Sequence, residues 1–183
     1  MHSLYQITTS IYEYISLKTL LLEVIICFLL IFLTAYIARL RGRELSRRKL
    51  LLYFSFLVNL CVLVEITVLG RVPDEKYVVR DFLDFGNMES WLGRRQILYS
   101  MLNVVLFVPY GIIVYLLRDD NSILRRIIFT VLISFIMSSA IEITQHITNR
   151  GYLELTDLVT NVLGGLIGAL VACLLQSLQK NDK

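Results

Sequence analysis

Charged residues, prolines and tryptophans are scarce in this sequence. Only 18% of its 183 residues are charged, two are prolines and one is a tryptophan, whereas 56% are hydrophobic. Soluble domains are typically about 25% charged and roughly 45–50% apolar, so a water-soluble globule is a poor interpretation. Two prolines also leave no room for a proline-rich linker. We therefore expect residues 1–183 to form a single membrane domain.

Cysteine and excess charge of one sign are also scarce. The three cysteines, Cys27, Cys61 and Cys173, lie within apolar runs and show no CxxC spacing, so we interpret them as small core residues. The net charge is only +3, and the basic excess falls in one short stretch instead of along an extended face. This pattern argues against nucleic-acid binding, and the sequence predicts no metal site and no cofactor.

Long apolar runs decide the fold class. A run of about 20 residues crosses the roughly 30 Å hydrocarbon core of a bilayer as an α-helix, whereas a helix of a soluble protein would be amphipathic. We predict an all-α integral membrane bundle of five transmembrane helices, at residues 18–38, 50–70, 97–117, 126–146 and 158–178.

Lysine and arginine predict the orientation of this bundle. Six basic residues fall within the eleven positions 39–49, and short loops rich in Lys and Arg stay in the cytoplasm. Five crossings then place the N-terminus outside and the C-terminus in the cytoplasm. The segment 71–96 becomes an outer loop, and its alternating aromatic and charged residues are typical of an interfacial element.

Polar side chains inside the predicted helices fall at one depth. At 1.5 Å per residue, along helices of alternating direction, five of them lie roughly 5 to 8 Å below the outer boundary. A carboxylate at mid-bilayer costs roughly 2.5 to 3.5 kcal/mol, so these groups should face the bundle interior and have partners. We predict a polar pocket that opens outward and is capped by the 71–96 loop. The five residues are Glu23, Glu65, Asn103, Glu142 and Asn161.

Two of the predicted helices carry stripes of polar and small residues. Asp157 and Asn161 lie one turn apart on the fifth helix. That helix also has small residues at four-residue steps, which allow helix backbones to approach closely. The small residues are Thr156, Thr160, Gly164 and Gly168, with Gly165 and Ala169 beside them. The stripe on the fourth helix comprises Ser138, Glu142, Gln145 and Asn149.

Several of these residues also suit purely structural roles. Asp157 could cap the fifth helix as well as bind a ligand, and Asn161 could form an interhelical hydrogen bond. Pro109 with Gly111 is typical of a helix kink. Glu142 is harder to explain structurally, because a buried carboxylate is a costly way to join helices. We expect it to bind a ligand or an ion.

Four further residues complete the candidate binding set. Asn103 and Gln145 would orient Glu142, while Arg94 and Arg95, at the outer mouth of the third helix, suit bidentate binding of phosphate or carboxylate. The candidate structural residues are Pro109, Gly111, Gly164, Gly165 and Gly168. The candidate ligand-binding residues are Glu142, Gln145, Asn103, Asp157, Asn161, Arg94, Arg95 and Glu65.

Three stretches lie in series on the third, fourth and fifth predicted helices. They are Asn103-Val-Val-Leu-Phe-Val-Pro-Tyr-Gly111, Ser139-Ala-Ile-Glu-Ile-Thr-Gln145 and Thr156-Asp-Leu-Val-Thr-Asn-Val-Leu-Gly-Gly165. In this order and spacing, over about residues 80–168, the sequence resembles the VanZ-like family of small bacterial multi-pass membrane proteins. Residues 81–85 depart from the family pattern, because the proline that members often have there is missing.

The resemblance implies a location in the bacterial cytoplasmic membrane and lowered sensitivity to teicoplanin-type lipoglycopeptides, since the family is named after an accessory factor for teicoplanin resistance in enterococci. It supplies no reaction. We hypothesise a binding module whose pocket engages an outer-leaflet lipid, a cell-wall precursor or the antibiotic. Two alternatives stay open: a membrane enzyme with Glu142 or Asp157 as general acid or base, and an ion-coupled transporter, for which a homo-oligomer would supply the symmetry. The sequence has no nucleophilic Ser or Cys next to a base, which favours binding over catalysis.

Overall fold

The computed structural model describes residues 17–70, 91–150 and 154–181, and these residues form helices and short turns without a strand. Five helices are long and apolar enough to cross a membrane, which confirms the predicted all-α class and the five predicted spans. The spanning segments are Lys18–Leu40, Arg47–Leu69, Gln96–Leu117, Ile123–Ile147 and Leu155–Gln179. Large apolar side chains are exposed along these segments, as expected of surfaces that face lipid tails.

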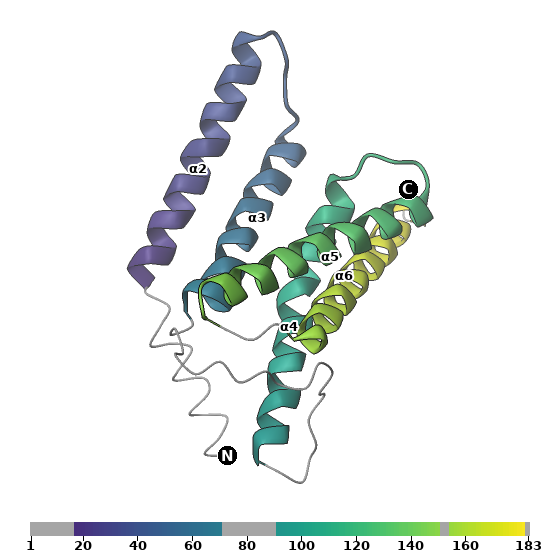
Figure 1. Ribbon diagram of the computed structural model, residues 1–183. Helices are drawn as coiled ribbons and strands as arrows, with labels where there is room; N and C mark the ends of the chain where they lie inside the picture. Colours follow the sequence, from purple (N-terminus) through teal and green to yellow (C-terminus); the bar gives the residue numbers. More distant parts are fainter. Residues whose placement is uncertain (1–16, 71–90, 151–153, 182–183) are drawn as a thin grey trace. The chain divides into compact units, whose positions relative to one another are not determined.

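The chain divides into two compact units, residues 1–72 and 73–183. The first unit contains α2 (Leu17–Leu40) and α3 (Arg47–Val64), which form a helical hairpin (Figure 1). Gly42 makes the turn between them with a φ of +69°, a conformation that glycine adopts without steric cost. Ser46 caps α3, because its side chain accepts a hydrogen bond from the backbone N–H of Lys49 (3.3 Å).

The last turns of the second spanning segment are wider than an α-helix. Residues Glu65–Leu69 form a π-helical turn, η1, and the backbone N–H of Gly70 donates to the carbonyl of Glu65 at 2.7 Å, five residues back. The hydroxyl of Thr67 donates to the carbonyl of Leu63 at 2.6 Å. Glu65, Thr67 and Val68 of this turn are buried.

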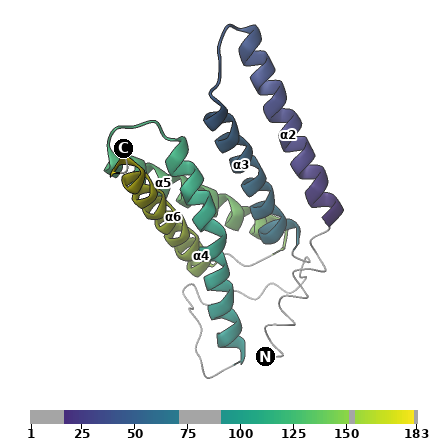
Figure 2. The same ribbon diagram turned by 180° about the vertical axis from the view of Figure 1, so that it is seen from behind.

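The second unit contains α4 (Trp91–Leu117), α5 (Ile123–Ile147) and α6 (Leu155–Asn181). Helix α6 packs against both of the others, most extensively against α4 (Figures 1 and 2). Gly164 lies against the backbone of Val104, and Gly168 lies against the backbone of Val108, so α4 and α6 run parallel. These contacts are between backbones, which fits the predicted role of the small residues on α6.

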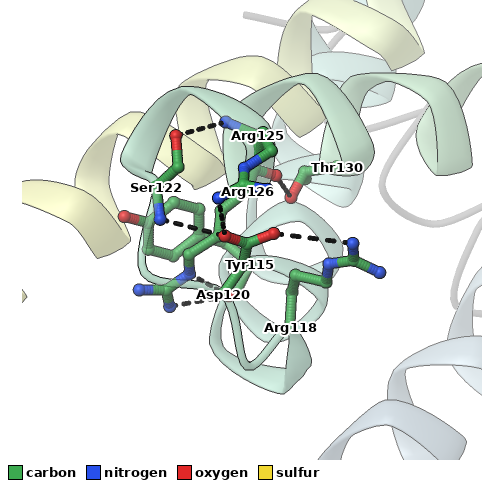
Figure 3. Close-up of polar contacts among 7 residues, drawn as sticks. All are labelled: Tyr115, Arg118, Asp120, Ser122, Arg125, Arg126 and Thr130. Atoms are coloured by element: carbon green, nitrogen blue, oxygen red, sulfur yellow. Dashed lines mark hydrogen bonds and ion pairs between the residues drawn. The ribbon is translucent and has the colours of Figure 1, made fainter.

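A polar cluster fixes the corner between α4 and α5 (Figure 3). Asp120 accepts a hydrogen bond from the backbone N–H of Ser122 (3.0 Å), and its carboxylate lies 3.2 Å from Arg125 and 3.6 Å from Arg118. The hydroxyl of Ser122 then caps α5 by accepting from the N–H of Arg125 (3.4 Å). A short turn is thereby held by its own side chains.

Arg126 joins the ends of all three helices at the same corner. Its guanidinium donates to the carbonyl of Tyr115 on α4 at 2.8 and 3.3 Å and to the side-chain oxygen of Gln176 on α6 at 2.8 Å. It also stacks on the Tyr115 ring, 3.9 Å from the centroid. Arginine suits this position because its planar group can donate in several directions while it stacks.

The third predicted helix begins earlier than expected. We expected an interfacial loop to extend to residue 96, but α4 begins at Trp91, because helical hydrogen bonding continues beyond the apolar run into polar residues. The rest of the expected loop, 71–90, lies outside the described residues. Pro109 lies inside α4, which continues through it and through Gly111 to Leu117.

Candidate functional site

Helix α5 carries a stripe of buried polar side chains. Ser134 and Ser138 are fully buried, Glu142 is 4% exposed and Gln145 is 1% exposed. The spacing of three or four residues between them keeps them on one face of the helix. The prediction for this face is confirmed from Ser138 to Gln145, although Asn149 lies beyond it.

Asn149 does not belong to the polar stripe, contrary to the prediction. It follows the end of α5 at Ile147, is exposed, and has a φ of +53°. Asparagine tolerates this left-handed conformation at the C-terminus of a helix. The helix therefore ends before the stripe can reach Asn149.

Helix α6 supplies the other side of the site. The side-chain amide of Asn161 donates to the hydroxyl of Ser138 (3.0 Å), and the carboxylate of Glu142 accepts from the backbone N–H of Glu154, just before α6 (3.1 Å). Gly165 lies directly against the side chain of Ser134. Residue numbers therefore increase along α6 as they decrease along α5, so the two helices are antiparallel. We call this antiparallel contact, made by Ser134, Ser138, Glu142, Asn161 and Gly165, the polar seam.

Two atoms of the polar seam are buried without a hydrogen-bond partner among the described residues. They are the hydroxyl oxygen of Ser134 and the amide oxygen Oδ1 of Asn161, which is 3% exposed. A buried polar atom left in this state costs about 1–3 kcal/mol. The amide oxygen of Asn161 is held in place by the bond from its nitrogen to Ser138, so it is a fixed acceptor.

Asn103 lies on α4 close to the level of the polar seam. It is 7% exposed, and its neighbour Val104 contacts Gly164, one turn after Asn161 on α6. Asn103, Ser138 and Asn161 therefore lie within about one helical turn of each other along the unit. Asp157 occupies the first turn of α6 and is partly buried. Ser138 meets Asn161, and Glu142 meets Glu154 about one turn further along α5.

Arg94 does not join this group, because it is exposed near the start of α4, whereas the side chain of Arg95, on the same helix, lies outside what the structure describes. Glu65 belongs to the first unit, where it is 7% exposed and interacts electrostatically with Glu23. One turn from this carboxylate pair, the thiols of Cys27 and Cys61 contact each other at 3.8 Å.

Ser134 was not predicted as a site residue. The signal was available, because the four-residue step of the stripe extends backward from Ser138 to Ser134 and to the fully buried Thr130. A hydroxyl in an apolar run gives a weak signal, since serine in a membrane helix also bonds its own backbone. Its burial and its contact with Gly165 distinguish Ser134 from Ser139, which is partly exposed and donates to the carbonyl of Phe135 (2.8 Å).

Five helices long and apolar enough to span a membrane, two of which bury a carboxylate and an amide where they pack together, are typical of a multi-pass membrane protein. The chain belongs to the VanZ/LLP1 family, whose model matches residues 19–176. It is 30% identical over 130 residues to Protein VanZ of Enterococcus faecium, a match that covers 69% of this chain and 73% of that protein. No solved structure matches the chain. The family match includes α2 and α3, and so extends beyond the motifs of the three C-terminal helices.

Proposed function

We propose that this protein lowers sensitivity to teicoplanin-type lipoglycopeptides by engaging an outer-leaflet lipid, a cell-wall precursor or the drug at the polar seam. The observation that carries the proposal is the burial of Glu142, at 4% exposure, in a helix apolar enough to cross a membrane. An ionisable side chain in such a helix is costly, and such residues usually serve a binding or transport site.

The groups around Glu142 indicate which ligands would fit. A carboxylate and the fixed amide oxygen of Asn161 both accept hydrogen bonds. A ligand that presents N–H or O–H groups would satisfy these acceptors. Amines, amides and sugar hydroxyls occur in lipid headgroups, in peptidoglycan precursors and in glycopeptides, so all three classes of ligand remain within the proposal.

The predicted orientation would place this site near the outer face of a bacterial cytoplasmic membrane. Glu142 lies five residues before the end of α5 at Ile147, and Glu154 immediately precedes α6. Glu142 is therefore near the end of its spanning segment and not at mid-bilayer. With the N-terminus outside, that end faces the cell exterior, where these antibiotics and their targets meet.

The proposal is tested by expressing the wild type and the Glu142→Gln and Asn161→Ala variants in a susceptible Gram-positive host. The Glu142→Gln change keeps the side-chain shape and an acceptor for the N–H of Glu154 but removes the charge. We expect the wild type to raise the teicoplanin concentration needed to stop growth, with a smaller effect on vancomycin, and both variants to lose this protection at unchanged protein level. Matched controls are Glu44→Gln and Gln179→Ala, which change exposed residues outside the seam.

Extracted lipids and cell-wall precursors should be analysed in the same strains. A new product that appears with the wild type and disappears with Glu142→Gln would replace binding by an enzymatic function, with the carboxyl group as general acid or base. A protective effect that depends on the proton gradient would favour an ion-coupled transporter. Unchanged drug sensitivity with the wild type would contradict the proposed function.

A further inference from the structure

The turn between α2 and α3 is the most basic segment of the described chain. Its six basic residues are all exposed, and Glu44 is its sole acidic residue. None of its five arginines forms an ion pair with a described residue. We call residues 39–49 the basic turn; its cations are Arg39, Arg41, Arg43, Arg47, Arg48 and Lys49.

The arginines at the corner of α4 and α5 provide a contrast. Arg118 and Arg125 both pair with Asp120, and Arg126 is engaged by Tyr115 and Gln176. Their charges are therefore used to hold the helices of the second unit together. Among the described residues, nothing comparable holds the arginines of the basic turn.

The position of three of these cations in the first turn of α3 makes their charge energetically more unfavourable. Arg47, Arg48 and Lys49 occupy this turn, which contains no acidic residue. The N-terminus of a helix carries a partial positive charge, so cations there are repelled while anions are stabilised. An anion bound at the basic turn would offset both the helix dipole and the clustered side chains.

The position of the basic turn indicates which anion this is. The turn joins two segments that are long and apolar enough to span a membrane, so it lies at the membrane boundary, where lipid headgroups are. Arginine binds phosphate through two parallel hydrogen bonds. We propose that the basic turn binds the phosphodiester headgroups of anionic lipids. This inference is independent of the polar seam and of the orientation of the chain.

Retention of lipids by the purified protein tests the proposal. The full chain, in a neutral detergent, is equilibrated with equimolar phosphatidylglycerol and phosphatidylcholine, re-purified, and its bound lipids are quantified by mass spectrometry. We expect the wild type to retain phosphatidylglycerol preferentially. The triple variant Arg41→Gln, Arg43→Gln, Arg47→Gln should lower this preference by up to about fivefold for each arginine removed.

Two controls separate charge attraction from a general effect of mutation. The triple lysine variant at positions 41, 43 and 47 keeps the charge and should keep most of the preference. Arg125→Gln removes one exposed cation that is already paired with Asp120 and should change little. A loss of preference in Arg125→Gln as large as in the triple glutamine variant would overturn the proposal.

The wild type alone gives a second measurement, which does not depend on how the variants fold. Raising the salt concentration from about 50 mM to about 500 mM shortens the screening length severalfold, so the preference for phosphatidylglycerol should fall. An absence of preference at low salt, or a preference that salt does not change, would also overturn the proposal.

Discussion

At the scale of single residues, Gly165 has little free space around it, because α6 meets both α4 and α5 there. A Cβ added at this position would lie 2.7 Å from the Cβ of Ser134 and even closer to its hydroxyl oxygen. We predict that Gly165→Ala lowers the free energy of unfolding by about 1–3 kcal/mol, through overpacking. Steric-trap measurements of unfolding in micelles would test this.

Matched variants can assign the effect of Gly165→Ala to the contact with Ser134. Ser134→Gly removes both atoms that the new methyl group would meet, so it should restore part of the lost stability in the double variant. Leu163→Ala, at a 46% exposed position of α6, should change stability by no more than about 0.5 kcal/mol. No rescue by Ser134→Gly would mean that Gly165 is needed for another reason.

Asp120 gives a prediction for pH dependence, at a position outside the spanning segments. The hydrogen bond from the N–H of Ser122 lowers the pKa of its carboxyl below the usual 3.8, and Arg125 and Arg118 lower it further, against an opposing effect of burial. A carboxyl with a lowered pKa stabilises the fold above its unfolded pKa, and that stability is lost as the pH falls through the folded pKa.

The carboxyl carbon of Asp120, followed by NMR, should therefore titrate with a midpoint below 3.8. Asp120→Asn should remove this contribution to the pH dependence of stability, because the amide cannot ionise. A midpoint at or above the usual value would show that the Ser122 bond and the two arginines do not govern the carboxyl.

At the scale of secondary-structure elements, Arg126 holds the ends of three helices. We predict that Arg126→Lys destabilises the second unit by about 1–3 kcal/mol, because an ammonium group cannot reproduce both the bonds to Tyr115 and Gln176 and the stacking on the ring. Arg125→Lys is the matched control, since that side chain is 69% exposed and should tolerate the change.

A double-mutant cycle between Arg126 and Gln176 would measure how α5 and α6 are coupled at this corner. We expect a coupling energy of about 0.5–3 kcal/mol, in the range usual for residues in direct contact. Additive effects of Arg126→Lys and Gln176→Ala would show that the 2.8 Å bond between them does not join the two helices energetically.

At the scale of the whole molecule, the direction of insertion is the main prediction. After replacement of Cys27, Cys61 and Cys173 by alanine, a single cysteine at position 3 should react with a membrane-impermeant maleimide in intact cells. A single cysteine at position 44 should react only after permeabilisation, because the basic turn is expected in the cytoplasm. The reverse pattern would invert the bundle and remove the polar seam from the outer face.

Much of the fold follows from the sequence, because apolar runs of spanning length are strong and local signals. All five helices were predicted within a few residues, and the small residues from Thr156 to Gly168 indicated close packing. The polar stripe of α5 followed from its spacing. The π-turn at Glu65, the partners of Arg126 and the thiol contact of Cys27 could not be predicted, because each depends on residues far apart or on helical geometry that periodicity does not encode.

The glycines between α4 and α6 restrict how far sequences with this fold can diverge. An added Cβ at Gly111 would meet the backbone of Gly165, and one at Gly164 or Gly168 would meet the backbone of α4. A clash with backbone atoms cannot be relieved by a smaller side chain elsewhere. A larger residue at any of these three positions would therefore force the helices apart. Position 165 differs, because its nearest neighbour is the side chain of Ser134. Relatives should therefore conserve glycine at 111, 164 and 168, and vary 165 only together with 134.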